Sequence, residues 1–377
     1  MIDPGDMAAI FAKAGVTPPS PKAEPQFVLP GNKFIVALFI IFVLLLFSRW
    51  PSQILTPKLY EEDSYVFAQD SERDGWGSIL IPYHGYLLVI PRIVSVILVE
   101  FFPERFLPFA FNLSALLITS LVALRIFQLQ TGTFLAIASA LMIVLVPNPG
   151  TGEPFLSLCC LHFFCAILLV CGCWPPEHDP IQPALRGAIL FLIGISGPEV
   201  IILLPVIGWR LYKSWDRDRS LYWLLPAAVV QIIAGFSSQS RFTVHLRDAS
   251  RLVEQVPAVF SFYCGHLFSG GVNGPITAII CLLILAWTFF DQTNRNRLHA
   301  AGIVFCAVLI ITASRMICPG WPNPAGLGSR YVYLLFALIA LSLISLLAGT
   351  RKRFNQGLIA LLLVMILSST AQHWSCS

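Results

Sequence analysis

The sequence predicts an all-α, polytopic membrane protein with about eleven transmembrane helices and almost no soluble domain. Hydrophobic residues make up 56% of the chain and charged residues only 12%, about half the charged share of an ordinary globular domain. The mean hydropathy of +0.77 is too high for a single soluble core. Apolar runs of about 17 to 25 residues, each able to cross a ~30 Å hydrocarbon layer, follow one another along the chain.

The first helix is predicted at 32–50, after a cytoplasmic N-terminal tail at 1–31 that has no apolar core of its own. Lys33 and Arg49 flank the apolar run, and no small-residue cleavage site follows it. We therefore expect a retained helix rather than a cleaved signal peptide. The rest of the chain, 32–377, is expected to form one transmembrane domain.

An exterior loop with juxtamembrane helices is predicted at 51–105. Residues 51–78 are polar, and the apolar stretch 79–102 is interrupted by Pro82, Gly85 and Pro91. A broken backbone survives at membrane depth only where it is buried in protein or faces a wet cavity. We therefore predict two interfacial or re-entrant pieces at 79–102 rather than a clean crossing.

The later spans are more regular, and basic residues give their orientation. The predicted spans are 106–127, 134–146, 155–171, 184–195, 200–212, 221–236, 275–290, 298–313, 331–347 and 357–369. With the N-terminus in the cytoplasm, the positive-inside rule is satisfied at nearly every turn. The basic residues on that side include Arg125, Arg186, Arg210, Lys213 and the run Arg351-Lys352-Arg353.

One exterior segment, 237–271, is itself basic and runs against this trend. It carries Arg241, His245, Arg247 and Arg251, against two acidic residues. These cations could bind an anionic group, or they could form a salt-bridge network within the loop. Arg330-Tyr331, at the start of a predicted helix, offers a second cation, which suits a phosphate or alternatively extends to the membrane interface.

The acidic candidates lie in three exterior segments. Glu61-Glu62-Asp63 is a run of adjacent carboxylates, and one of them held near apolar walls could act as a general base. The alternative is a solvated acidic loop. Glu153 follows a Gly- and Pro-rich turn, and Glu199 follows Gly197-Pro198 between two spans. A carboxylate beside hydrocarbon is costly unless it is paired or used.

Aromatic residues and one histidine lie together in the run Tyr83-His84-Gly85-Tyr86. The tyrosines could form an aromatic belt at the membrane interface. His84 could shuttle a proton or bind phosphate.

The order of these features resembles the GT-C superfamily of membrane glycosyltransferases, which use polyprenyl-phosphate-linked sugars and include the protein O-mannosyltransferases and the lipid A aminoarabinose transferases. The resemblance covers about 32–212 and Arg330-Tyr331. Its motifs are the acidic run before His84-Gly85-Tyr86, the start Glu153-Pro154-Phe155-Leu156, and a Pro-Tyr-x-Gly-Tyr-Leu-x-x-x-Pro-Arg pattern that ends at Arg92. Many members have Thr-Lys-Gly-Pro between two spans, where this chain has Ser196-Gly197-Pro198 without the lysine.

The resemblance implies an inverting transferase of the bacterial plasma membrane whose active site faces the periplasm. Asp63 or Glu62 would be the general base, Glu61 would lie beside them, and Glu153 would position the acceptor. The donor would be a polyprenyl phosphate or diphosphate sugar. The residues that would bind it are Tyr83, His84, Tyr86, Arg92, Arg241, Arg247, Arg330 and Tyr331.

The acceptor would be a glycan, a lipid or a protein, as in cell-envelope polysaccharide biosynthesis, with membrane lipids as the surrounding partners and no nucleic acid. No cofactor is certain: some members of the superfamily depend on a metal and others do not, and Glu62 and Asp63 could ligate Mg²⁺ or Mn²⁺. Two other functions stay open: a lipid or solute transporter or flippase, and a noncatalytic membrane assembly subunit. Against a transporter, the charges gather at one face and no internal repeat is evident.

Overall fold

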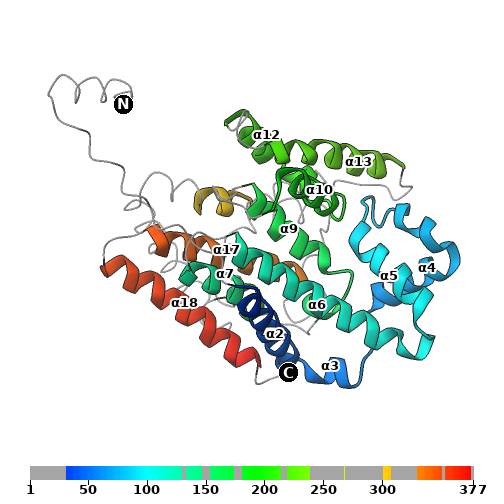
Figure 1. Ribbon diagram of the computed structural model, residues 1–377, viewed down its shortest axis with the longest axis horizontal. Coiled ribbons are helices and arrows are strands. Elements are labelled where there is room, and N and C mark those ends of the chain that lie inside the picture. Colours follow the sequence, from blue (N-terminus) through cyan, green and yellow to red (C-terminus); the bar gives the residue numbers. More distant parts are fainter. Residues whose placement is uncertain are drawn as a thin grey trace, which may run out of the picture. The chain divides into compact units, whose positions relative to one another are not determined.

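The described part of the protein is helical and belongs to one compact unit, Gly31–Ser377 (Figure 1). The computed structural model describes residues 31–129, 133–146, 153–173, 181–213, 219–237, 267, 300–306, 329–349 and 353–374. Within these ranges there is no strand, only an isolated bridge between Tyr83 and Tyr86. The predicted all-α class is therefore confirmed for this part of the chain.

The N-terminal part alternates one long helix with several short ones. Its elements are α2 (Asn32–Arg49), α3 (Pro51–Leu55), the π-helix η1 (Asp63–Ala68), α4 (Gln69–Asp74), the 3₁₀ helix η2 (Gly75–Leu80), α5 (Val89–Phe101), the 3₁₀ turn η3 (Glu104–Phe106) and α6 (Leu107–Gln128).

The remaining described elements are mostly apolar helices. They are α7 (Thr133–Leu145), α8 (Glu153–Leu156), α9 (Leu161–Gly172), α10 (Pro183–Gly194), α11 (Glu199–Ile202), α12 (Leu204–Lys213), the 3₁₀ helix η4 (Arg219–Trp223), α13 (Leu224–Ser237), α17 (Ser329–Gly349) and α18 (Arg353–Trp374).

Most predicted spans correspond to one helix, but two of them are divided. The span predicted at 155–171 consists of α8 and α9, separated by residues 157–160, and the span at 200–212 consists of α11 and α12. The span at 275–290 lies outside the described residues, and only 300–306 of the span at 298–313 is described, as helix.

The interrupted stretch 79–102 is broken as its prolines and glycine indicate. It consists of the end of η2, a turn at 81–88 and α5. With 13 residues, α5 is about 20 Å long, less than the thickness of a hydrocarbon layer.

The core of the unit lies around α9, where every residue except Leu168 is buried. The helices α5, α6, α8, α10, α11 and α17 pack against it. By contrast, α2, α13 and α18 expose apolar side chains, including Leu44, Phe236 and Val364. Exposed apolar faces of this kind are typical of surfaces that contact lipid or another protein.

Three helical stretches are long and apolar enough to cross a membrane: Asn32–Arg49, Glu104–Gln128 and Arg219–Ser237. Shorter apolar helices accompany them, among them Leu161–Gly172 and Pro183–Gly194. These are the features of a membrane-associated helical protein. The number of crossings is not determined by the described helices.

Candidate functional site

Asp63 occupies a fully buried position at the start of η1 and is tied to the segment before α9. Its Oδ1 atom accepts hydrogen bonds from the Ser157 hydroxyl (3.1 Å) and the Cys159 amide (2.9 Å). Its Oδ2 atom accepts one from the Leu158 amide (3.0 Å). Two stretches nearly one hundred residues apart in the chain are thus joined by one carboxylate.

The local sequence explains why these amides need an acceptor. α8 ends at Leu156 and α9 begins at Leu161, so residues 157–160 interrupt the helix. The amides of Leu158 and Cys159 lie in this interruption, before the N-cap of α9 at Cys160, and donate to the Asp63 carboxylate. A carboxylate from outside satisfies them and also interacts favourably with the positive end of the helix dipole.

Burial raises the pKa of Asp63 to about 7, because an ionised carboxylate loses most of its hydration there. The three hydrogen bonds act in the opposite direction, and the neighbouring charge of Glu62 raises the pKa further. Because the Asp63 carboxyl group is fully buried, it is poorly placed to contact a substrate directly.

The other acidic candidates lie beside this carboxylate. Glu61 is exposed and Glu62 is half-buried. Glu153 begins α8, which ends one residue before the Ser157 that binds Asp63. The structure therefore brings together the backbone of the two acidic segments, while the side chain of Glu153 lies outside what it describes. Of the two proposed bases, Glu62 is the more accessible one, and Asp63 holds the segments together.

The aromatic candidates form a tight turn. The amides and carbonyls of Tyr83 and Tyr86 bond to each other (2.8 and 3.1 Å), and His84 and Gly85 between them have φ angles of 48° and 88°. Positive φ at both central residues is the pattern of a type I′ turn. Glycine adopts it freely, whereas histidine is strained there, and such strain clusters at functional sites.

This turn packs between η1 and α9. The Tyr83 ring lies 6.3 Å from Phe67 and 4.2 Å from His84, while the Tyr86 ring lies 6.3 Å from His162. His84 itself is exposed. Tyr83 therefore contacts η1, the element that Asp63 begins, and Tyr86 lies beside α9.

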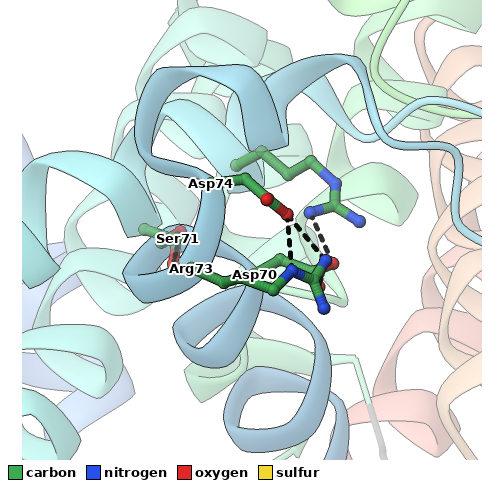
Figure 2. A network of polar contacts seen from close by, with 6 residues as sticks. Asp70, Ser71, Arg73 and Asp74 are labelled. Atoms are coloured by element: carbon green, nitrogen blue, oxygen red, sulfur yellow. Dashed lines mark hydrogen bonds and ion pairs between the residues drawn. The ribbon is translucent and has the colours of Figure 1, made fainter.

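Arg92 has a supporting position instead of a substrate-facing one. Its side chain is 1% exposed, its Nη1 is 3.1 Å from Asp70 Oδ2, and its guanidinium lies over the Phe67 ring. The same Asp70 pairs with Arg73 (2.9 Å), which also pairs with Asp74 (2.6 Å). Figure 2 shows Asp70, Arg73 and Asp74 converging on α4. We therefore assign Arg92 to holding α4 and η1 against α5, and not to phosphate binding.

Two titratable residues of this region meet in the structure, and sequence reasoning named only one of them. His162 Nε2 lies 4.0 Å from Glu199 Oε1, and both side chains are buried. Burial raises the pKa of Glu199 to about 8. The sequence signal for His162 was its place in the apolar run 155–171, where an ionisable residue is by default a functional candidate.

A buried cation, Arg49, adjoins the same region and was noted in the sequence only as a flanking charge. It donates hydrogen bonds to the carbonyl oxygens of Val144 and Val146, at the end of α7. Its guanidinium lies 4.3 Å from the Trp50 ring and 4.9 Å from the Phe155 ring of α8. Such a cation over aromatic faces gains about 2 kcal/mol when desolvated.

For the remaining residues predicted to bind the sugar donor, the structure describes no side chain. Arg241 and Arg247 lie outside the described residues. Arg330 and Tyr331 lie in the first turn of α17, but their side chains are not described. Their neighbour Tyr333 donates a hydrogen bond from its hydroxyl to the Ile143 carbonyl (2.8 Å), which places the start of α17 at the end of α7.

The Asp63 carboxylate does not fit a Mg²⁺ or Mn²⁺ site. Both of its oxygens accept hydrogen bonds from N–H or O–H groups, whose positive ends would face the cation. Within the described ranges, no group of three or more His, Cys, Asp or Glu side chains is arranged to hold a metal ion. We derive no metal-dependent step from this site.

Comparison of the chain with protein-family models, curated proteins and solved structures finds no match.

Proposed function

We propose that the protein is an integral-membrane glycosyltransferase that moves a sugar from a polyprenyl-phosphate or diphosphate donor to an acceptor outside the bacterial plasma membrane. The observation that carries this proposal is the set of three hydrogen bonds from 157–159 to Asp63. They hold the acidic run Glu61–Asp63 beside α8, whose first residue is Glu153. The tyrosine turn packs on the same elements.

The proposed topology has eleven crossings with the N-terminus in the cytoplasm, and the directions of four helices support it. Arg49 at the end of α2 binds carbonyls at the end of α7. Tyr333 near the start of α17 binds Ile143, and Thr370 near the end of α18 binds Leu145. In the proposed topology, α2, α7 and α18 all end outside and α17 begins there, so these four helix ends belong on one side.

The proposed chemistry is a single displacement at the anomeric carbon. The acceptor oxygen or nitrogen forms a bond to that carbon while the carbon–oxygen bond to the phosphate breaks. The electron pair leaves with the lipid phosphate, and the acceptor proton passes to Glu62. The product has inverted anomeric configuration. Hydrogen-bond donors near the phosphate, where negative charge grows, would lower the activation barrier of the transfer. We give this role to Arg241, Arg247 or Arg330.

The tyrosine turn suits the sugar of such a donor. Sugar rings present C–H faces that pack on aromatic rings, and their hydroxyls need polar partners nearby. Tyr83 and Tyr86 offer ring faces, and the exposed His84 between them offers an N–H group. Glu153 would then orient the acceptor from the opposite exterior segment.

The test is a transfer assay with the purified full-length protein in nanodiscs. Undecaprenyl phosphate carrying glucose, galactose, mannose, N-acetylglucosamine or aminoarabinose is supplied in turn, with an envelope extract as acceptor, and release of undecaprenyl phosphate is measured. We expect one donor to be consumed. Glu62→Gln should lower the rate by about 10²- to 10⁴-fold, whereas Glu72→Gln, the same change at an exposed residue of α4, should leave it unchanged.

Two results would contradict the proposal. If, in proteoliposomes of the same purified protein, a fluorescent lipid-linked sugar crosses the membrane intact, with no release of lipid phosphate, the protein is a flippase. If none of the donors is consumed or moved and Glu62→Gln has no effect in cells, a noncatalytic assembly role is favoured.

A further inference from the structure

The side chains of His162 and Glu199 lie next to each other and are both buried. A neighbouring carbonyl group defines which ring nitrogen of His162 faces Glu199. His162 Nδ1 lies 2.6 Å from the Cys159 carbonyl oxygen. A carbonyl oxygen only accepts hydrogen bonds, so Nδ1 carries the hydrogen. The other ring nitrogen, Nε2, therefore faces Glu199 Oε1 at 4.0 Å.

The Glu199 carboxylate lies directly against Gly197. A Cβ atom at position 197 would lie 2.2 Å from Glu199 Oε2 and 3.3 Å from His162 Cβ. Any side chain at this position would therefore displace the carboxylate from the imidazole. The glycine of the turn between α10 and α11 is what allows the two groups to approach.

The same histidine is connected to Asp63 through one residue. Cys159 accepts a hydrogen bond from His162 at its carbonyl and donates one from its amide to Asp63. A change in the direction of the imidazole therefore acts on the segment that holds Asp63.

From this geometry we infer that His162 and Glu199 are an electrostatically coupled positioning pair that holds residues 157–159 against Asp63. Their side chains are only 8% and 7% exposed. A single buried charge is costly, whereas a pair that contains one exchangeable proton is neutral overall in both of its forms. Those forms are imidazole with carboxylic acid, and imidazolium with carboxylate. The two groups therefore titrate as a pair.

Burial raises the pKa of Glu199 to about 8. Two other titratable side chains lie against the pair. Cys165 of α9 interacts electrostatically with Glu199, and the Tyr86 ring lies beside His162. On α13, the neutral Gln231 binds Leu87 and Gly194.

Other charged or titratable side chains lie on the elements packed against α9, α11 or their neighbours, and each contacts a residue outside the pair. These contacts are Arg92 with Asp70, Arg125 with Gln128, Arg186 with Gly172, Arg210 with Trp209, Lys213 with Tyr212 and Tyr333 with Ile143. Glu153 on α8 is the acid whose side chain is not described.

The first test is infrared difference spectroscopy of the purified full-length protein across pH. Carboxylic C=O bands should disappear in the wild type as the pH rises through the pKa values of Asp63 and Glu199. The band of Glu199 should be missing in Glu199→Gln and present in Glu72→Gln. In His162→Asn, the amide N–H still reaches the Cys159 carbonyl, but the partner that could take the proton is gone. The midpoint of the band should therefore rise by about one pH unit or more, a tenfold change in proton affinity.

Gly197→Ala separates position from chemistry because it leaves both titratable groups in the protein. We expect it to raise the midpoint as His162→Asn does. The second measurement is hydrogen–deuterium exchange at Leu158 and Cys159, which should become faster in Glu199→Gln and Gly197→Ala than in Glu72→Gln.

An unchanged midpoint in both His162→Asn and Gly197→Ala would overturn the coupling, and unchanged exchange at 158–159 would overturn the positioning role. Neither measurement depends on glycosyl transfer. A failure of the transfer assay and a failure of this inference are therefore recognised separately.

Discussion

Arg49 and Asp63 are buried charges in adjoining parts of the molecule, and each is held by the backbone of a helix end. Arg49 donates to two carbonyl oxygens at the end of α7. Asp63 accepts from two amides, and from one hydroxyl, just before α9. Each charge has the sign that complements the helix dipole it meets.

The two sites differ in what surrounds the charge. The Arg49 guanidinium lies over the rings of Trp50 and Phe155, and it stays charged at neutral pH. Asp63 has polar donors around it and a pKa of about 7, so its charge responds to pH. We conclude that Arg49 is a constant structural contact between α2 and α7, whereas the contact made by Asp63 is adjustable.

Replacing Asp63 by alanine should give the largest effect. The change leaves two buried amides and the Ser157 hydroxyl without this acceptor, and each unsatisfied buried group costs about 1–3 kcal/mol. We expect a loss of about 3–5 kcal/mol in the free energy of unfolding, measured by SDS titration in mixed micelles. Glu72→Ala, at an exposed acid of α4, is the control. A loss as small as the control's would mean that water replaces the carboxylate.

Replacing Arg49 by methionine should have the next largest effect. Methionine keeps much of the volume, but the carbonyls of Val144 and Val146 lose their donor, and the cation over Trp50 and Phe155 is removed. Unsatisfied carbonyls are tolerated better than unsatisfied amides, so we expect a loss of about 2–4 kcal/mol in the same measurement. Arg49→Lys should retain part of the stability. Equal losses for both variants would assign the effect to shape alone.

The titration of Asp63 predicts a pH dependence with a definite sign. The folded-state pKa of about 7 lies above the ordinary value of 3.8, so between these values the folded protein binds more protons than the unfolded chain. Stability should therefore fall as the pH rises from about 4 to about 7, by roughly 1 kcal/mol per pH unit. Asp63→Asn should flatten this slope in melting curves recorded from pH 4 to 8, whereas Glu72→Asn should not. An identical slope in Asp63→Asn would show that other groups are responsible.

The smallest effect is expected at Arg73, the exposed residue of α4 that pairs with Asp70 and Asp74. Arg73 pairs with Asp70 and Asp74 at the surface, where ion pairs are screened by water and salt. Arg73→Ala should leave the melting temperature unchanged within error. Arg92→Leu should lower it, because the buried guanidinium binds the same Asp70. If both variants behave alike, burial does not explain the difference between these two arginines.

Much of the fold could be predicted because apolar runs and their lengths are properties of the chain alone. The helices at 32–50 and 106–127 lie within a few residues of their predicted bounds, and the break at 81–88 follows from Pro82, Gly85 and Pro91. The division at 203 follows from Pro205, which cannot continue a helix from the preceding turn. The division at 157–160 could not be predicted, because residues 157–160 contain neither proline nor glycine. The hydrogen bonds from the amides of residues 158 and 159 to Asp63 join residues that are far apart in the sequence.

The candidate site could be predicted only in part. Acidic and aromatic residues in segments broken by Pro and Gly were predicted to belong to one region, and Tyr83 packs on Phe67 of η1, the element that Asp63 begins. The support role of Arg92 and the approach of His162 to Glu199 could not be predicted, since both depend on partners from other helices.

Sequence alone was enough for the helical, apolar character of the chain and for the list of side chains with chemistry, because both follow from residue types and local periodicity. The burial of Asp63, the pairing of His162 with Glu199 and the contact of that carboxylate with Gly197 required the tertiary structure. The physical reason is that the cost of burying a charge depends on which distant backbone and side-chain groups surround it, and helix packing brings those groups together.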